Sequence, residues 1–410
     1  MLDIKYIRDN ADSVQKMAAD KGYQVSIAEL LKADQYRRDL LVKIDRLRTE
    51  RKKLADTKSK PSADTITKGK IIKDQIADLE IDLSEAETDY KRLINAIPNT
   101  FSPDTPIGPE EAFTVKSEHG KKGTKAIDHL DFATKRDWVD FERGAKVAGT
   151  KFYYLKGDLA QLEVALLSYG LEKITKAGFT FMDVPYLVNE RISEGTGFAP
   201  RSDEQTDSYF IEGEDLALIG TAEVALTGYH ADEIIDEKNL PLLYAAYSPC
   251  WRKEAGAAGK HTRGLFRVHQ FNKLEMYAFC LPENSEEIHQ KILAVEEEIW
   301  QDLGIPYRVI NIPSGDLGAP AWKKYDIEYW SPVDGAYREL TSCSNCTDYQ
   351  ARNLQIRVRR SDGSVEALHT LNGTVIAMGR TLISILENYQ KGDKLVVPKV
   401  LQKYLGKEEI

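Results

Sequence analysis

Two runs of apolar residues between positions 27 and 97 constrain the fold more than any other feature of this chain. Within each run the apolar residues recur at alternating spacings of four and three, which is the heptad pattern of a coiled coil. The breaker cluster Ser59–Asp64 separates the runs, so two long helices are predicted to fold back as an antiparallel hairpin. With about 28 residues in each helix, this arm would be roughly 40 Å long. The seam positions are Leu40, Ile44, Leu47, Arg51 and Leu54, then Ile72, Ile76, Leu79, Leu83, Ala86, Tyr90, Leu93 and Ile97.

The predicted arm is basic although the chain as a whole is acidic. The formal net charge is −9, yet residues 36–73 contain 13 Lys and Arg against 5 Asp and Glu. A basic element on an acidic body indicates a local contact with a polyanion. The alternative is an ordinary solvated helix surface, and charge alone does not decide between the two. The candidate contact residues are Arg37, Arg38, Lys43, Arg46, Arg51, Lys52 and Lys53.

Length and composition predict a cytoplasmic protein of several domains. Domains usually contain 100–200 residues, so 410 residues predict two or three of them. The chain has no basic start followed by an apolar run, and no apolar stretch near ~18 residues, so neither a secretory signal nor a membrane span is expected. Four cysteines, Cys250, Cys280, Cys343 and Cys346, are too few for a disulfide framework. One Cys-x-x-Cys pair is weak evidence for zinc, and no structural zinc is expected.

A proline-rich linker at residues 98–114 is predicted to separate an N-terminal domain, residues 1–97, from a body at residues 115–410. In the body, strand-like runs are not regularly followed by crossover helices. This favours an α+β fold, with an antiparallel or mixed sheet and flanking helices, over a doubly wound one. The expected strands include Lys151–Leu155, Leu242–Tyr247, Gly264–Phe279 and Tyr307–Ile312, and the expected helices include Leu159–Ala177, Glu286–Leu303 and Thr381–Gln390.

The segment Tyr247–Tyr277 carries the clearest indication of a functional site. It is predicted to form a strand, a polar glycine-rich loop and a second strand whose side chains alternate between two faces. A strand face with so many charged and aromatic groups is unusual in an acidic body, although an ordinary exposed hairpin face is the alternative. The apolar face carries Phe266, Val268, Leu274 and Met276, and the other face carries Arg267, His269, Phe271, Lys273, Glu275 and Tyr277.

The residues of this hairpin match what a nucleotide needs. A guanidinium such as that of Arg252 binds phosphate, and an aromatic ring such as that of Phe271 stacks on adenine. The carboxylate of Glu254 could accept from the adenine amino group. Glu275 lies about 13 Å beyond Phe271 on the same face, which is the reach from adenine to the acyl end of an aminoacyl-adenylate. The loop Gly256–His261 superficially resembles a phosphate loop, but its spacing is wrong.

Two further segments contain candidate ligands for a polyphosphate. Glu339 and Ser342 could hold Mg²⁺ through their oxygen atoms. Arg380 opens an apolar helix, where its guanidinium would add to the free backbone donors of the helix N-terminus. The alternative for the second segment is an ordinary strand, turn and helix with a solvated arginine.

Four motifs resemble those of class II aminoacyl-tRNA synthetases, and specifically of the seryl-tRNA synthetase family. Trp251–Glu254 is similar to the second motif of the class, and Gly379–Arg380 with its helix is similar to the third. Gly178–Pro185 resembles the first motif, which usually packs at a dimer interface, and Thr221–Glu223 resembles the amino-acid-binding triplet of the family. The resemblance extends over essentially the whole chain.

The resemblance implies a cytoplasmic homodimer that joins L-serine to tRNA(Ser), using ATP with Mg²⁺, and whose arm reaches tRNA across the dimer. It implies that Arg252 and Arg380 are catalytic and that Glu339 and Ser342 hold Mg²⁺ through the phosphates. The implied ATP-binding residues are Arg252, Lys253, Glu254, Val268, Phe271, Glu339, Leu340, Thr341, Ser342 and Arg380. The implied serine-binding residues are Thr221, Ala222, Glu223, Arg252, Glu275, Asn372 and Thr374.

Two positions depart from the usual pattern of the family, and two other functions stay open. Trp251 stands where phenylalanine is common and Thr374 where serine is common, but an aromatic ring and a hydroxyl are retained. One alternative function is a related ligase that loads an amino acid onto a carrier protein, and the other is a non-catalytic RNA-binding paralogue. The sequence also leaves open whether a selenocysteine tRNA, tRNA(Sec), is a substrate.

Overall fold

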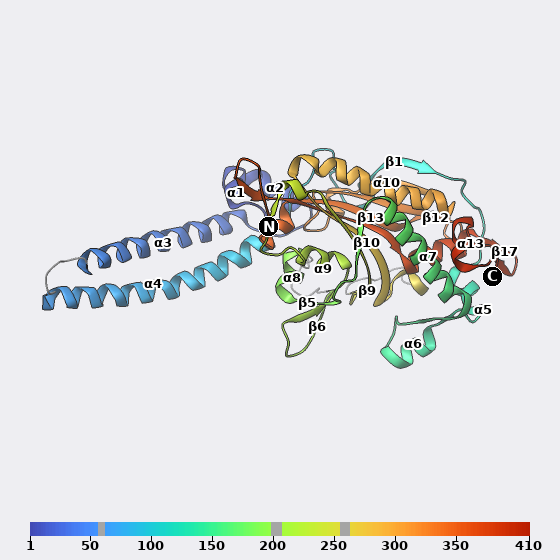
Figure 1. Cartoon of the computed structure of the whole chain (residues 1–410), viewed down its shortest axis with the longest axis horizontal. Coiled ribbons are helices and arrows are strands. Elements are labelled where there is room, and N and C mark those ends of the chain that lie inside the picture. The colour runs from blue at the N-terminus through green and yellow to red at the C-terminus, as the bar shows by residue number, and fades with distance from the viewer. Residues whose placement is uncertain (56–61, 198–206, 255–262) are drawn as a thin grey trace. The chain divides into compact units, whose positions relative to one another are not determined.

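The computed structural model describes residues 1–55, 62–197, 207–254 and 263–410. The chain divides into two compact units, Met1–Pro98 and Asn99–Ile410 (Figure 1). The first half of the breaker cluster Ser59–Asp64, and the loop Gly256–His261, lie outside the described residues. In the described part of the chain, no helix is both long enough and apolar enough to cross a membrane.

The first unit contains the predicted helical hairpin. Its two long helices run side by side in opposite directions, and Arg48 of one forms an ion pair with Glu80 of the other at 2.7 Å (Figure 1). Ile44, Ile72 and Ile76 are buried between them, so the heptad prediction is confirmed. The helices of this unit are α1 (Ile4–Asp9), α2 (Ala11–Asp20), α3 (Ile27–Ala55) and α4 (Ala63–Ala96).

A buried carboxylate organises the base of the hairpin. Asp34 in α3 is fully buried, and its oxygens lie 2.6 Å from Arg8, 3.4 Å from Arg37 and 3.2 Å from Arg38. The guanidinium carbon of Arg37 also lies 4.4 Å from the ring centre of Tyr90 in α4. These arginines therefore stabilise the hairpin, since a buried carboxylate needs cationic partners.

The second unit is built on one eight-stranded sheet. Its strands follow the order β1-β11-β12-β13-β16-β10-β9-β4, and every neighbouring pair is antiparallel except β4 and β9. The predicted α+β fold is thus confirmed. The strands are β1 (Thr114–His119), β4 (Thr180–Met182), β9 (Leu242–Trp251), β10 (Gln270–Cys280), β11 (Tyr307–Asn311), β12 (Lys323–Ser331), β13 (Ala336–Thr347) and β16 (His369–Ala377).

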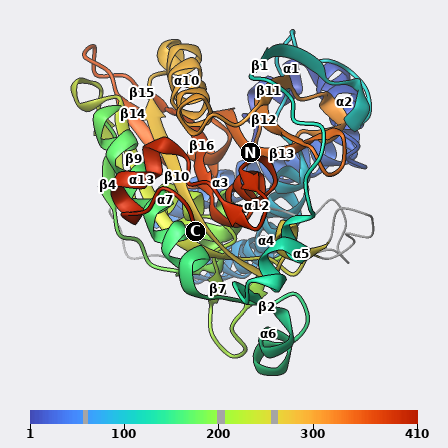
Figure 2. The same cartoon turned by 90° about the vertical axis from the view of Figure 1, so that its right-hand side faces the viewer.

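Four helices cover one face of this sheet and form the main core with it (Figures 1 and 2). The packing is closest at Gly373 of β16, where a Cβ atom would lie 2.2 Å from Cγ2 of Ile292. Any side chain at Gly373 would therefore push a helix off the sheet. The four helices are α7 (Gly157–Lys176), α10 (Ser285–Leu303), α12 (Met378–Asn388) and α13 (Lys399–Leu405).

Two short helices pack on the opposite face of the sheet, α9 (Ala222–Gly228) and α11 (Tyr349–Asn353), against Tyr277 and Phe279 of β10. The remaining helices and strands are short. They are α5 (His129–Lys135), α6 (Phe141–Ala148), α8 (Glu190–Gly195), β2 (Val139–Asp140), β3 (Tyr154–Leu155), β5 (Leu187–Asn189), β6 (Tyr209–Phe210), β7 (Leu216–Leu218), β8 (Ile234–Asp236), β14 (Arg357–Arg359), β15 (Val365–Ala367), β17 (Gln390–Lys391) and β18 (Lys394–Leu395).

Two of the expected strands begin later than predicted. The expected strand Gly264–Phe279 starts with a 3₁₀ turn at Gly264–Phe266, and its ladder begins only at Gln270. The expected strand Lys151–Leu155 pairs only over Tyr154–Leu155. In both cases the predicted strand was too long, because strand-like residue types continue into a segment that has no partner strand.

The start of the proline-rich stretch packs within the second unit. The backbone N–H of Asn99 donates to the carbonyl of Ala319 at 2.8 Å, and its side-chain amide donates to the carbonyl of Cys346 at 2.9 Å. Further on, Lys323 forms an ion pair with Asp104 at 2.8 Å. These contacts tie the entry of the chain into the second unit to the strands β12 and β13.

Two register shifts in the sheet decide which side chains face away from the core. Between β12 and β13, Ile327 pairs with Thr341 but Glu328 pairs with Glu339, so Leu340 is an extra residue. Between β10 and β16, Val375 is extra in the same way. Such a β-bulge interrupts the strict alternation of side chains. As a result, Leu340 and Val375 enter the main core while Glu339 and Ser342, and Thr374, line a cavity on the other face.

Candidate active site

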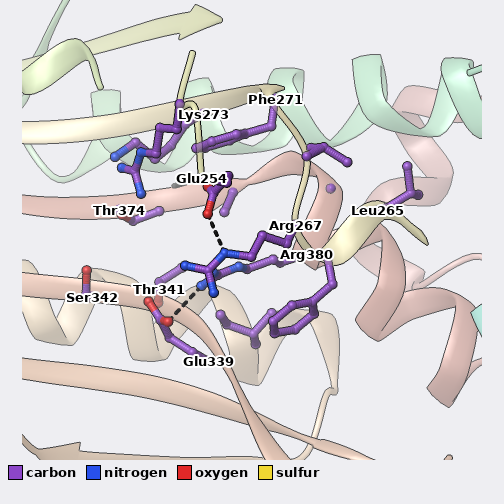
Figure 3. A pocket seen from close by; sticks show the side chains of 16 residues that line it. Glu254, Leu265, Arg267, Phe271, Lys273, Glu339, Thr341, Ser342, Thr374 and Arg380 are labelled. Atoms are coloured by element: carbon purple, nitrogen blue, oxygen red, sulfur yellow. Dashed lines mark hydrogen bonds and ion pairs between the residues drawn. The ribbon is translucent and has the colours of Figure 1, made fainter. Parts of the chain in front are cut away.

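A cavity of about 210 Å³ opens on the sheet face opposite the main core (Figure 3). It is lined by the residues that follow β9, by the segment that leads into β10, by β10, β13 and β16, and by the first turn of α12. Residues predicted from the sequence that line it are Arg252, Glu254, Val268, Phe271, Glu339, Leu340, Thr341, Ser342, Thr374 and Arg380. The lining also includes Leu265, Phe266, Arg267, Lys273, Ala377 and Gly379, which were not predicted as site residues.

Arg252 and Phe271 lie together, as a nucleotide platform requires. The guanidinium carbon of Arg252 is 5.3 Å from the ring centre of Phe271. The Nε atom of Arg252 donates to the carbonyl of Gly220 at 3.2 Å, and the Arg252 backbone N–H donates to the carbonyl of His269 at 3.0 Å. These hydrogen bonds fix the Arg252 guanidinium just after β9, next to the ring of Phe271.

Glu254 forms an ion pair with Arg267 inside the cavity (Figure 3). The backbone of Glu254 has a φ of 52°, in the left-handed region that few residues other than glycine adopt. This conformation ends the extension of β9 and turns the chain at the cavity. Arg267 lies before the ladder of β10 begins, so strand alternation is not what places it there.

Glu339 and Arg380 form a second ion pair across the cavity, at 3.0 Å (Figure 3). Arg380 lies in the first turn of α12, and its guanidinium carbon is 4.9 Å from the ring centre of Phe266. Burial by itself would raise the pKa of Glu339, but the charges of Arg380 and Lys324 outweigh it and lower the pKa to about 2. Glu339 is therefore ionised throughout the physiological range.

The cavity has an excess of positive charge although the chain is acidic. Four cationic side chains line it against two carboxylates, those of Glu254 and Glu339. Both carboxylates already have an arginine partner, and Lys273 is paired with Glu275, so Arg252 is the lining cation that forms no ion pair within the described residues. Several guanidinium groups in a partly dehydrated cleft favour phosphate groups in particular. The four cations are Arg252, Arg267, Lys273 and Arg380.

A buried polar cluster adjoins the cavity at Lys273. Glu275 of β10 accepts hydrogen bonds from the Lys273 ammonium at 2.8 Å, from the hydroxyl of Thr221 and from the backbone N–H of Glu223 at 3.3 Å. Thr221 also caps the N-terminus of α9, so the cap that begins this helix holds a side chain of the sheet. The polar cluster is defined by Thr221, Glu223, Lys273, Glu275, Gln350 and Asn372.

Glu223 forms the other end of the polar cluster. Its Oε1 atom accepts from Gln350 at 2.6 Å and from Asn372 at 2.9 Å. Burial and the nearby charge of Glu275 raise the pKa of Glu223 to about 7, against the opposing effect of hydrogen bonds from Gln350 and Asn372. The carboxyl of Glu223 therefore titrates close to neutral pH, which is a common property of functional sites.

Two of the residues predicted for the ATP and serine sites belong neither to the cavity lining nor to the polar cluster. The Nζ atom of Lys253 lies 5.6 Å from the ring centre of Tyr209 and 6.0 Å from that of Phe210. Ala222 is buried in the core between α9 and the sheet. All four cysteines are buried free thiols, and the described residues contain no group of three or more His, Cys, Asp or Glu placed to hold a metal.

Sequence reasoning missed Arg267, Lys273 and Gln350 as site residues, and different signals could have found them. Lys273 lies two residues before Glu275 on the face already assigned to the site, so alternation alone predicts it. Alternation also placed Arg267 on that face, but its segment is irregular, since Phe266 and Val268, which alternation placed on the core face, line the cavity as well. Gln350 is contributed by α11, and only the tertiary structure brings it to Glu223.

The arrangement suits two ligands held side by side. The cationic cavity with its aromatic wall fits a nucleotide polyphosphate, and the small buried cluster fits a polar molecule with a positive charge and a hydroxyl. Lys273 belongs to both regions. It lines the cavity together with Thr374, and it is hydrogen-bonded to Glu275 in the cluster. Two ligands bound in this way would meet without water between them, which favours a reaction that joins them.

Comparison with known families gives two matches that together extend over most of the chain. Residues 1–101 match the family described as seryl-tRNA synthetase N-terminal domain. Residues 208–389 match the family described as tRNA synthetase class II core domain (G, H, P, S and T).

Curated proteins and solved structures similar to this chain agree with those families. A serine--tRNA ligase of Dictyoglomus turgidum is 44% identical, with 100% of this chain and 99% of that protein covered. One of Treponema denticola is 41% identical, with 100% of both covered. The crystal structure of seryl-tRNA synthetase from Pyrococcus horikoshii complexed with ATP is 40% identical, with a TM-score of 0.91 over 100% of this chain and 99% of that one. The chain therefore belongs to the seryl-tRNA synthetase family of class II aminoacyl-tRNA synthetases.

Proposed function

We propose that this chain activates L-serine with ATP to form seryl-adenylate and then transfers the seryl group to tRNA(Ser). The observation that carries the proposal is the continuity between the cationic cavity and the buried cluster around Glu223 and Glu275, which share Lys273. Membership of the family supports the same reaction. The presence of Arg252, Glu254, Glu339 and Arg380 in one cavity argues against a non-catalytic paralogue.

The cavity residues have separate roles toward ATP in this proposal. Phe271 stacks on the adenine, and Arg252 beside it binds the α-phosphate. Glu254 accepts from the adenine amino group once it leaves Arg267, and Arg380 binds the terminal phosphates. The family resemblance adds backbone contacts from Val268, and assigns Leu340, Thr341 and Lys253 to the same site.

The reaction needs no nucleophile from the protein. An oxygen of the serine carboxylate attacks the α-phosphorus of ATP, and the bond to pyrophosphate breaks. The terminal ribose hydroxyl of the tRNA then attacks the seryl carbonyl, loses its proton and displaces AMP. The protein contributes orientation and neutralises charge, with Arg252 and Arg380 facing the phosphates.

Glu339 and Ser342 fit a divalent cation such as Mg²⁺ that accompanies ATP. The register shift places both on the cavity face, and the low pKa of Glu339 keeps its carboxylate ionised. Mg²⁺ takes oxygen ligands from one or two carboxylates and from phosphates. When bound, it would neutralise charge on the phosphates.

Selection of serine follows from the polar cluster. The carboxylate of Glu223 pairs with the serine ammonium, because Gln350 and Asn372 both donate to Oε1, which leaves Oε2 without a donor in the described part of the chain. Glu275 and Thr374 contact the serine hydroxyl. Alanine would leave these buried polar groups unpaired, which lowers its use by several powers of ten.

Replacing Arg252 with alanine tests the catalytic proposal. Removal of the α-phosphate contact should lower serine-dependent exchange of pyrophosphate into ATP by about 10²- to 10³-fold. Arg143→Ala is the control, since Arg143 is an exposed arginine paired with Asp140 outside the cavity. Exchange by the Arg252 variant at nearly the rate of the unmodified protein would contradict the role of this residue.

The pKa of Glu223 predicts how serine use depends on pH. Below a pH of about 7 the carboxyl is protonated and cannot pair with an ammonium, so kcat/KM for serine should rise with pH and level off above about 7. The measurement is pyrophosphate exchange at limiting serine across this range. Glu223→Gln should be much less active and lose the dependence. A flat profile for the unmodified protein between about pH 6 and about pH 8 would contradict the assignment.

We propose that exposed bases of α3 contact the tRNA backbone. Arg37 and Arg38 are engaged with Asp34, so the proposal rests on the other five predicted bases, all of them exposed. They are Lys43, Arg46, Arg51, Lys52 and Lys53.

Replacing these five bases together by alanine should separate tRNA charging from chemistry. Pyrophosphate exchange should stay unchanged, while KM for tRNA(Ser) should rise by about tenfold or more and depend less steeply on salt, because fewer counterions are released. Unaltered charging of tRNA(Ser) would contradict this role. Charging of a carrier protein in place of tRNA by the unmodified chain would favour the alternative ligase, and a parallel assay with tRNA(Sec) tests that substrate.

We propose a cytoplasmic homodimer that pairs through the region of β4, with each arm reaching tRNA across the dimer. The strand β4 ends the sheet and exposes Phe181 at 44%, and Val164 of the adjacent α7 is 64% exposed. Exposed apolar groups beside a sheet edge fit an interface between copies. Phe181→Asp should convert a particle of twice 46.3 kDa into a monomer in light scattering, whereas Val365→Asp on β15 should not. A monomeric unmodified chain would contradict the dimer.

A further inference from the structure

Lys273 lines the cavity (Figure 3) and also belongs to the polar cluster, through its hydrogen bond to Glu275. Its side chain is only 9% exposed, and its ammonium donates to Oε1 of Glu275 at 2.8 Å and to Oγ1 of Thr221 at 2.9 Å. One buried cation thus holds two of the side chains that the proposed function assigns to serine. None of the contacts proposed for ATP or for serine is made by Lys273.

The hydrogen bonds around Lys273 have a fixed direction. An ammonium can only donate, so Oγ1 of Thr221 accepts from Lys273 and donates its own hydrogen to Oε2 of Glu275. The Glu223 backbone N–H donates to the same Oε2 atom at 3.3 Å. Lys273 therefore determines both the orientation of the Glu275 carboxylate and the direction in which the Thr221 hydroxyl points.

Lys273 also balances charge that the neighbouring elements leave uncompensated. Burial raises the pKa of the Cys250 thiol on β9, of Tyr277 on β10 and of Glu296 on α10, and so favours the neutral form of each. The charged groups that remain near the cluster are the carboxylates of Glu223 and Glu275, and the cations Lys273 and Arg252. Loss of Lys273 would leave two buried carboxylates facing each other.

We propose that Lys273 is the positioning residue for serine selection, holding Glu275 as a fixed acceptor for the serine hydroxyl. This rests on the proposed function of the polar cluster. A Glu275 carboxylate held in one orientation discriminates against a substrate that lacks the hydroxyl, because no other group of that substrate takes the place of the hydroxyl as a donor. A carboxyl that is free to rotate or to take up a proton loses that discrimination. Lys273 acts through Glu275 and Thr221 and need not touch serine.

Lys273→Met tests the proposal, since methionine keeps the length of the side chain and removes its charge and donors. Pyrophosphate exchange is measured with serine and with alanine at several pH values. The ratio of kcat/KM for serine to that for alanine should fall by about tenfold or more, mainly through KM for serine, while KM for ATP stays within about twofold. The pH midpoint of kcat/KM for serine should move upward from about 7, because the charge of Lys273 lowers the pKa of Glu223 and its loss removes that effect.

Lys273→Arg and Lys176→Met complete the experiment. Arginine retains the charge, so its pH midpoint should stay where it is in the unmodified protein, while its different donor geometry lowers the serine-to-alanine ratio. Lys176 is an exposed lysine paired with Glu172, and its variant should behave as the unmodified protein.

The outcomes separate this proposal from the function on which it rests. Variants of Lys273 that lose stability or overall rate with an unchanged substrate ratio and pH midpoint would give the lysine a structural role only and overturn the proposal. If Lys273→Met does not fold, an unchanged substrate ratio in Lys273→Arg is the result that overturns it. Absence of serine-dependent exchange in the unmodified protein would instead refute the proposed function.

Discussion

Charge compensation on the sheet face opposite the main core is the constraint on which the second unit depends. The face opposite the main core carries carboxylates at Glu254, Glu275 and Glu339, and each forms an ion pair with a cation from a nearby strand, loop or helix. At Lys273 and Glu275, whose side chains are both buried, an unpaired charge would cost several kcal/mol. In the cavity, a polyanion such as ATP can displace one partner of a pair, and the freed cation then binds the ligand. The ion pairs that stabilise the folded unit thus also prepare it for a charged substrate.

The register of the sheet determines which side chains face the cavity. Strict alternation would place Glu339 and Ser342 on opposite faces, because they are three residues apart. The extra residue Leu340 brings both to the cavity, and Val375 has the same effect beside Thr374. Close packing of α10 on Gly373 keeps β16 flat against the core at this point. The strands that contain these β-bulges are therefore held in place by tight packing on their other face.

Much of this could be predicted from the sequence where the determining interaction is local. The heptad spacing predicted the hairpin, and the residues beside one glycine-rich loop predicted the pairing of Arg252 with Phe271. Residues held by distant parts of the chain could not be found in this way. Gln350 reaches Glu223 only through the tertiary fold, and the register shifts depend on strand pairing. Arg37 and Arg38 were predicted as tRNA contacts from charge alone, but the buried Asp34 that engages them is visible only once the helices are packed.

The central claim is that the cavity and the polar cluster together form a site for ATP and serine. It is tested most directly by pyrophosphate exchange with the purified protein and each of the twenty amino acids in turn. We expect serine to support exchange, and alanine and threonine to support it less well, alanine by roughly 10⁴-fold. Exchange that depends on a different amino acid, or on none of the twenty, would contradict the account.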